Sequence, residues 1–210
     1  MTEKTAQKEP GKKPAPSKKP KPQQEVVVQI SLSELHPFPD HPFQVREDAS
    51  MQETAESVKE YGVLVPALAR PREDGGYELI AGHRRKHACE LAGLATMPVI
   101  VRDIDRDAAT IIMVDSNLQR ENILPSERAK AYKMKMEAIK RQGARTDLTS
   151  PKISAKFRSD DEVGQDAGVS GDTIRNYIAL TQLVPELQQM VDEKKIALSP
   201  AYQIAALTPK

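Results

Sequence analysis

Short apolar runs alternate with helix-spaced apolar positions along residues 25–124. Strands are predicted over 26–30, 77–81 and 97–101, and a further apolar run covers 63–69. Helices are predicted after Ser50, over 83–91, and after Asp105 or Asp107, either of which would cap the third helix. Ser50 and Glu53 form a capping-box pattern, so the first helix is expected to begin there. The mixture predicts a small mixed α/β domain.

Pro125 marks a change of pattern. Proline ends the preceding segment and is well tolerated just before a new helix, for which Ser126 is the expected N-cap. Apolar residues then follow at spacings of three and four, and the remainder reads as several short helices. We therefore expect an α+β/α organisation: a basic Pro- and Lys-rich arm over 1–24, an α/β domain over 25–124 and an all-α domain over 125–210.

The net charge of +1 conceals an uneven distribution. Residues 1–22 carry +5 and residues 126–158 carry +7, whereas residues 23–125 carry −7 and residues 159–210 carry −4. Two basic stretches favour a polyanionic partner, although the chain lacks the strongly basic balance typical of DNA-binding domains. The single cysteine excludes a disulfide framework, and no apolar run is long enough for a membrane span, so we expect a cytoplasmic protein.

A glycine stands between the predicted strand 77–81 and the helix 83–91, followed by fixed cations. Arg84, Arg85 and Lys86 fall in the first helical turn, where each exposed cation costs about 0.3–1 kcal/mol because the helix dipole is already positive there. An anion would reverse this effect, since backbone N–H groups and arginine forks would bind it, and Gly82 would let the backbone approach closely. The pattern predicts a phosphate site; a solvated basic face is the alternative.

Asn117 and Arg120 lie at the end of the helix predicted after Asp105. An amide oxygen suits a Mg²⁺ ion held mainly by phosphates and water, and an arginine suits a phosphate oxygen. Taken alone, the segment is an ordinary polar helix end, and it gains meaning only beside the Gly82 turn. A metal set of His83, His87 and Glu90 is the weaker alternative, because the intervening cations repel a metal ion.

Residues 162–177 have the layout of a helix-turn-helix. Val163 and Ile174 fall where two short helices must bury apolar groups, Gly168 supplies the turn, and Ser170 caps the second helix. Such a helix places its first exposed side chains in the major groove, and Asp172 is expected to orient a neighbour. A helical hairpin without DNA is the alternative. The residues expected to contact DNA are Arg145, Lys152, Ser170, Gly171, Thr173, Arg175 and Asn176.

Taken together, these motifs resemble the ParB family of DNA partition proteins. The resemblance rests on Gly82-His83-Arg84-Arg85 after a strand, on Asn117-Leu118-Gln119-Arg120-Glu121, and on the helix-turn-helix behind them. It extends over about residues 25–205, with Leu35-His36-Pro37, Phe43-Gln44-Val45-Arg46 and Gly62-Val63-Leu64-Val65-Pro66 in agreement. It implies a ParB/sulfiredoxin-like N-terminal domain followed by a helix-turn-helix domain.

The resemblance implies a function in plasmid, mobile-element or chromosome partition. The N-terminal domain would bind CTP with Mg²⁺, and the helix-turn-helix would bind a palindromic centromere-like DNA site. CTP would close a homodimeric clamp on DNA that a ParA-type ATPase moves, placing the protein on the nucleoid. Asn117 would hold the metal. The implied nucleotide-binding residues are Gly62, Val63, Leu64, Gly82, His83, Arg84, Arg85, Asn117 and Arg120.

Three features depart from the family pattern. His83 stands where the family usually has Glu, and Ser116 stands where it has the Glu tied to hydrolysis. Because a hydroxyl is no carboxylate base near neutral pH, CTP hydrolysis is expected to be slow or absent, and no catalytic residue is assigned. The chain ends at Lys210 where the family continues into a dimerisation domain, so either the protein is truncated or it dimerises through other surfaces.

Two other function classes stay open. A helix-turn-helix transcriptional regulator without a nucleotide switch would use the same DNA-binding residues. An enzyme related to sulfiredoxin or to ParB-like nucleases is less favoured. Sulfiredoxin chemistry needs a cysteine beside the phosphate turn, whereas Cys89 lies about two helical turns further on. A nuclease would need clustered carboxylates for two metal ions.

Overall fold

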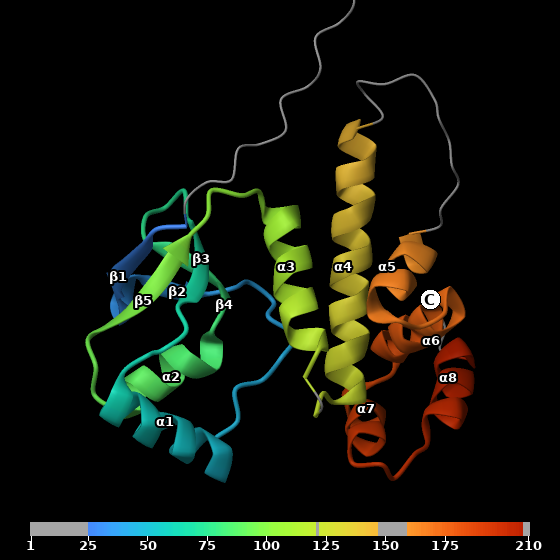
Figure 1. Cartoon of the computed structure of the whole chain (residues 1–210). Coiled ribbons are helices and arrows are strands. Elements are labelled where there is room, and N and C mark those ends of the chain that lie inside the picture. The colour runs from blue at the N-terminus through green and yellow to red at the C-terminus, as the bar shows by residue number, and fades with distance from the viewer. Residues whose placement is uncertain (1–24, 121, 147–158, 208–210) are drawn as a thin grey trace, which may run out of the picture.

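The computed structural model describes residues 25–120, 122–146 and 159–207 of the 210-residue chain. A sheet with two helices occupies one side of the molecule and a group of short helices the other, with α3 and α4 between them (Figure 1). The predicted α+β/α fold class is confirmed. The predicted arm over 1–24 lies outside the described residues. Within the described ranges, no helix is both long and apolar enough to cross a bilayer.

The sheet is mixed, with five strands in the spatial order β1-β5-β3-β4-β2. β3 lies parallel to β5 and antiparallel to β4, while β1 pairs antiparallel with β5 and β2 pairs parallel with β4. The predicted strands are present, and the apolar run 63–69 enters the sheet only from Ala67. The bounds are β1 Val27–Ser31, β2 Leu35–Pro37, β3 Ala67–Pro71, β4 Tyr77–Ala81 and β5 Thr96–Val101.

Alternating side chains of the central strands bury two different layers. Leu79 faces the core shared with α1 (Ala49–Tyr61) and α2 (His83–Leu91), which cover one face of the sheet. Ile80, the next residue, faces the core shared with α3 (Arg106–Leu118) on the opposite face. Because successive strand residues point to opposite faces, both sides of β4 are apolar, and the strand is held between two helical layers.

Two helix starts differ from the sequence-based expectation. Helix α1 is capped by Asp48, whose Oδ1 accepts a hydrogen bond from the backbone N–H of Met51 at 2.8 Å, so the capping box at Ser50 is wrong. An aspartate cap satisfies a free N–H as well as serine does, and it begins the helix two residues earlier. Helix α3 is capped by Asp105, one of the two alternatives.

The C-terminal half is helical, and its long first helix begins earlier than expected. Helix α4 starts at Pro125, so Ser126 is inside the helix and not its N-cap. The hydroxyl and backbone N–H of Ser126 instead donate to the Asp192 carboxylate at 2.5 and 2.9 Å. The helices are α4 Pro125–Thr146, α5 Ser159–Ala167, α6 Gly171–Ala179, α7 Pro185–Asp192 and α8 Leu198–Leu207, with 3₁₀ turns at Leu32–Glu34 and Leu180–Gln182.

Helix α4 packs against both halves of the molecule. Ala131 and Met134 pack in the core formed with α3, whereas Ala129 and Tyr132 pack with the C-terminal helices (Figure 1). The same helix carries Lys135, whose ammonium donates to Asp115 of α3 and Asp166 of α5 at 2.7 and 2.8 Å. Since α4 belongs to both cores, the domain boundary at residue 125 stays a prediction.

Candidate phosphate site and DNA-reading helix

The turn before α2 has a conformation that requires glycine. Gly82 is the N-cap of α2 and has φ 112° and ψ 18°, in the left-handed region. A Cβ at this position would lie 2.8 Å from Cβ of Ala67, which is fully buried in β3. The glycine therefore lets the chain pass close to the neighbouring strand while the first N–H groups of α2 stay at the end of the sheet.

Six of the nine expected nucleotide-binding residues surround one cavity of about 240 Å³. They come from the Gly82 turn, from α2 and from the end of α3, and the loop from His41 to Val45 closes the remaining side. A larger cavity of about 520 Å³ adjoins it and shares Arg84, Arg120 and Gln44. The six residues are Gly82, His83, Arg84, Arg85, Asn117 and Arg120.

The other three expected residues line a separate cavity. Gly62, Val63 and Leu64 border a hollow of about 390 Å³ against α1, and Arg85 is the residue that this hollow shares with the first cavity. Leu64 is 78% exposed, so an apolar surface is available there for a flat ring. The structure thus places the predicted phosphate and base residues in two cavities that meet at Arg85.

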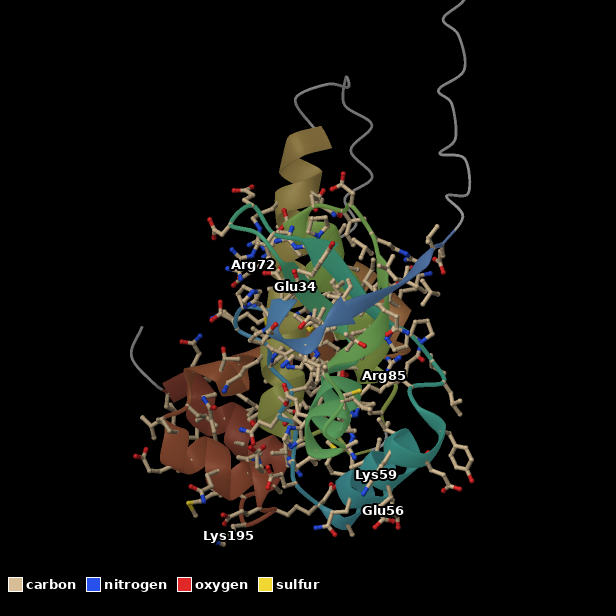
Figure 2. All side chains as sticks on the ribbon, turned by 90° about the vertical axis from the view of Figure 1, so that its left-hand side faces the viewer. Glu34, Glu56, Lys59, Arg72, Arg85 and Lys195 are labelled. Carbon is tan, nitrogen blue, oxygen red and sulfur yellow. The ribbon has the colours of Figure 1, made fainter. Side chains whose placement is uncertain are left out.

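Arg85 holds the loop between these cavities. Its Nη1 donates to the carbonyl oxygens of Val65 and Pro66 at 2.5 and 2.6 Å, and burial lowers the pKa of the guanidinium. In Figure 2 the residue lies above Lys59 and Glu56 of α1. One face of Arg85 is therefore engaged with the loop carbonyls, which positions that loop against α2.

Arg84 lies where the cavities of about 240 and 520 Å³ adjoin. Its Nη2 is 3.6 Å from Oδ1 of Asp48 and 3.3 Å from Oγ of Ser50, both at the start of α1. Asp48 is half-exposed and is also the α1 cap. A carboxylate of the protein thus shares the guanidinium, and an incoming phosphate would compete with it for Arg84.

Asn117 fits a metal held mainly by phosphates. Its Nδ2 donates to the carbonyl of Met113 at 2.8 Å, so the oxygen Oδ1 is the atom a Mg²⁺ ion would take. The hydroxyl of Ser116 also donates to the carbonyl oxygen of Met113, at 3.0 Å. The alternative metal set is not assembled: His87 contacts Glu47 and Glu90, and no cluster of three ligand-type side chains occurs in the described ranges.

Two contributors to the site were not among the residues expected from sequence. His41 lies against His83, and Glu127 of α4 holds the wall of the cavity. The carboxylate of Glu127 accepts from the backbone N–H of Gln44 at 3.0 Å and from that of Leu124 at 3.1 Å. The segment 43–46 carried a family signal, but nothing local indicated that a residue of α4 would anchor it.

The helix-turn-helix has the expected capping and turn. Gly168 has φ 68°, and Oγ of Ser170 accepts from the N–H of Thr173 at 3.2 Å, which caps α6. Gly171, however, is buried, and a Cβ there would meet the Asp161 carboxylate at 2.3 Å, so its expected exposure to DNA is wrong. It allows close packing of α5 on α6.

Two exposed side chains of α6, Arg175 and Asn176, are the candidates for contact with DNA bases. Arg175 forms ion pairs with Asp160 of α5 and with Asp172, the neighbour that was expected to orient it. Asn176 is exposed beside it. Two of the residues expected to contact DNA precede the helix-turn-helix. Lys152 lies outside the described residues, and Arg145 belongs to α4, where only its backbone is described.

The contact of Gly164 with the turn predicts a sharp mutational effect. A Cβ on Gly164 would lie 2.6 Å from the carbonyl oxygen of Val169 and 3.2 Å from the N of Gly171. Gly164→Ala is therefore expected to separate α5 from α6, to lower the free energy of unfolding by about 1–3 kcal/mol and to abolish DNA binding. Urea denaturation and a DNA titration measure both effects. Gln165→Ala, on the exposed side of α5, is the matched control; equal stability of the two variants would contradict the prediction.

Comparison with known proteins identifies a family and several relatives of this chain. The ParB N-terminal domain family matches residues 16–118. The chromosome-partitioning protein Spo0J of Thermus thermophilus is 34% identical over 88% of this chain and 61% of its own length, and stage 0 sporulation protein J of Bacillus subtilis is 30% identical over 89% and 60%. The chain thus spans about three fifths of the length of these relatives.

A solved structure shares the fold. It is the C-terminally truncated chromosome-partitioning protein ParB from Caulobacter crescentus complexed to the centromeric parS site. The two chains are 28% identical with a TM-score of 0.55, over 85% of this chain and 84% of that one. The N-terminal match, the full-length relatives and the shared fold all point to one family, and the chain belongs to the ParB family.

Proposed function

We propose that this chain binds CTP with Mg²⁺ in its α/β part and a centromere-like DNA site through its helix-turn-helix, with the nucleotide controlling how the protein is held on DNA. One observation carries the nucleotide half. Six residues from two separate segments, the Gly82 turn with the start of α2 and the end of α3, meet around a single cavity, and three of the six are arginines. Convergent arginines and free backbone N–H groups bind phosphates well.

Each part of the cavity has a role in this proposal. The N–H groups after Gly82 and the guanidinium groups of Arg84 and Arg120 bind the phosphates, while Asn117 supplies one oxygen to the metal. Mg²⁺ neutralises phosphate charge. The hollow at Gly62–Leu64 takes the base, with Arg85 between the two.

The DNA half rests on the helix-turn-helix and on the relative solved with parS DNA. Asn176 and Arg175 are the side chains suited to read base edges, and Arg175 would exchange its contacts with Asp160 and Asp172 for DNA. The partition role, a homodimeric clamp and a ParA-type ATPase partner are parts of the same proposal, drawn from the family.

A titration of the full chain with Mg²⁺ and each of the four NTPs, with and without short palindromic DNA, tests this function. We expect a preference for CTP, a change in DNA retention when CTP is added, and slow or absent CDP release because Ser116 offers no base. Equal weak binding of all NTPs would contradict the nucleotide half. DNA binding without any nucleotide effect would favour a transcriptional regulator, in which the Asp48 carboxylate keeps Arg84 paired.

A further inference from the structure

Two histidines from distant segments are in ring contact at the phosphate cavity. The ring centroids of His41 and His83 lie 3.9 Å apart, with the ring planes inclined by 42°. His41 belongs to the loop before α1, His83 is the first residue of α2, and both line the cavity of the Gly82 turn. The fold therefore places two titratable groups beside the position proposed for the phosphates.

Each ring has a buried nitrogen without a partner. The Nε2 atoms of His41 and His83 are both inaccessible and make no hydrogen bond within the described ranges. Nδ1 of His41 lies 2.7 Å from the carbonyl oxygen of Phe43 and must donate to it, so Nε2 of the neutral ring carries the lone pair. Buried polar atoms are nearly always paired, and an unpaired one calls for an explanation.

The surroundings keep His83 neutral. Burial, together with smaller effects of His41 and Lys86, lowers its pKa to about 3. A neutral ring has no charge to offer an anion. A negative charge in the cavity would oppose the effect of Lys86 and would raise this pKa.

The same reasoning applies to His41. Burial lowers its pKa, the hydrogen bond to Phe43 acts in the opposite direction, Arg120 lowers it and Glu127 raises it. The charged groups around the pair are Arg84, Arg85 and Lys86 of α2, Arg120 after α3, Glu127 of α4 and Asp48 before α1.

We propose, on the basis of the nucleotide function above, that His41 and His83 are binding residues of the phosphate site and that the pair takes up a proton when a nucleoside triphosphate binds. The proton comes from solvent and adds to an Nε2 atom, which converts a buried lone pair into an N–H donor and gives the cavity one more positive charge. This assigns a role to His83, where the family usually has Glu.

The sign of the pH dependence follows from the two states. Without nucleotide the pair is neutral, and with nucleotide its pKa is higher, so the bound state holds more protons between the two pKa values. Affinity for the triphosphate therefore increases as the pH falls through that interval, by at most about tenfold per pH unit for each proton taken up.

Calorimetry of the full chain with CTP and Mg²⁺ tests the proposal. Titrations near neutral pH in buffers of different ionisation enthalpy count the protons, and a series from pH 6 to 8 gives the affinity. We expect net proton uptake of about 0.5–1 per CTP, and tighter binding at pH 6 than at pH 8. His83→Gln and His41→Gln each replace a titratable ring with a polar side chain that does not titrate. In each variant, the number of protons taken up when CTP binds is expected to fall, leaving only the change that comes from the nucleotide itself. His36→Gln, a half-buried histidine of β2 away from the cavity, is the matched control.

A proton resonance titration of the histidine rings in the unsubstituted chain shows where the proton goes, and does so even where a variant fails to fold. Two ring resonances are expected to titrate at higher pH after CTP is added. Equal proton uptake in the full chain and in both variants would overturn the proposal, as would CTP affinity that is constant from pH 6 to 8; the nucleotide function would stand in either case. A chain that binds no CTP at any pH would overturn the nucleotide function and this proposal together.

Discussion

Arg84→Ala is expected to lower CTP affinity by about 10- to 150-fold, which an ordinary titration detects. A charge-assisted hydrogen bond to phosphate contributes about 1.5–3 kcal/mol, and a cavity that relies on few cations cannot replace it. Calorimetry with CTP and Mg²⁺ measures the loss. Arg72→Ala removes a surface arginine at the turn after β3, far from Arg85 in Figure 2, and is the matched control. Undiminished binding by the Arg84 variant would exclude this cavity as the phosphate site.

The contact between Asp48 and Arg84 predicts a second variant whose CTP affinity changes in the opposite direction. Asp48→Asn keeps a good N-cap on α1 but removes the carboxylate that shares Arg84. CTP affinity is expected to rise several-fold, because the nucleotide no longer competes with a negative charge. Weaker binding would show that Asp48 assists the nucleotide.

Lys135→Ala is expected to cost about 3 kcal/mol of the free energy of unfolding. The side chain is 1% exposed, and its ammonium joins α4 to Asp115 of α3 and to Asp166 of α5. Burial would lower the pKa of Lys135, but the hydrogen bonds to the two carboxylates outweigh it and raise the pKa. Removing one member of a buried ion pair costs about 3–5 kcal/mol, and the half-exposed carboxylates regain some hydration, so the lower end applies.

Urea denaturation measures this loss, with two variants for comparison. Lys130→Ala removes an exposed lysine of the same helix and is expected to change stability by less than about 0.5 kcal/mol. Lys135→Met keeps an apolar chain in the buried position and is expected to lose less than the alanine variant. If Lys135→Ala and Lys130→Ala have the same free energy of unfolding, the contacts of Lys135 with Asp115 and Asp166 contribute nothing to stability.

Helices, strands and caps that depend on residues close together in the sequence were predictable. A short apolar run over 77–81 identified β4, helical spacing identified α2 and α3, and Ser170 was correctly placed as the cap of α6. The Gly82 turn was also recognisable, because a strand, a glycine and a run of cations each depend on neighbours within one or two turns. The resemblance to ParB joined these local signals into one family.

The expectations that failed or were incomplete involve competition between groups. Asp48 rather than Ser50 caps α1, and Ser126 lies inside α4 with its hydroxyl on Asp192. Asp48 and Ser50 are both acceptable capping residues, so the local sequence does not choose between them. Gly171 was expected at the DNA surface and is instead the close contact between α5 and α6.

The sequence by itself determined most of the strands and helices, the glycine turn and the helix-turn-helix, because short apolar runs, period-3.6 patterns and caps act between residues close in the chain. Strand β2 at Leu35–Pro37, in a segment that reads as a proline-rich loop, was not predicted. Only the tertiary structure brought His41 onto His83, Glu127 onto the loop at Gln44, and Lys135 between two helices of different parts. Such contacts depend on how the sheet, α3 and α4 pack in three dimensions, and no local pattern records which distant side chain will lie within hydrogen-bonding distance.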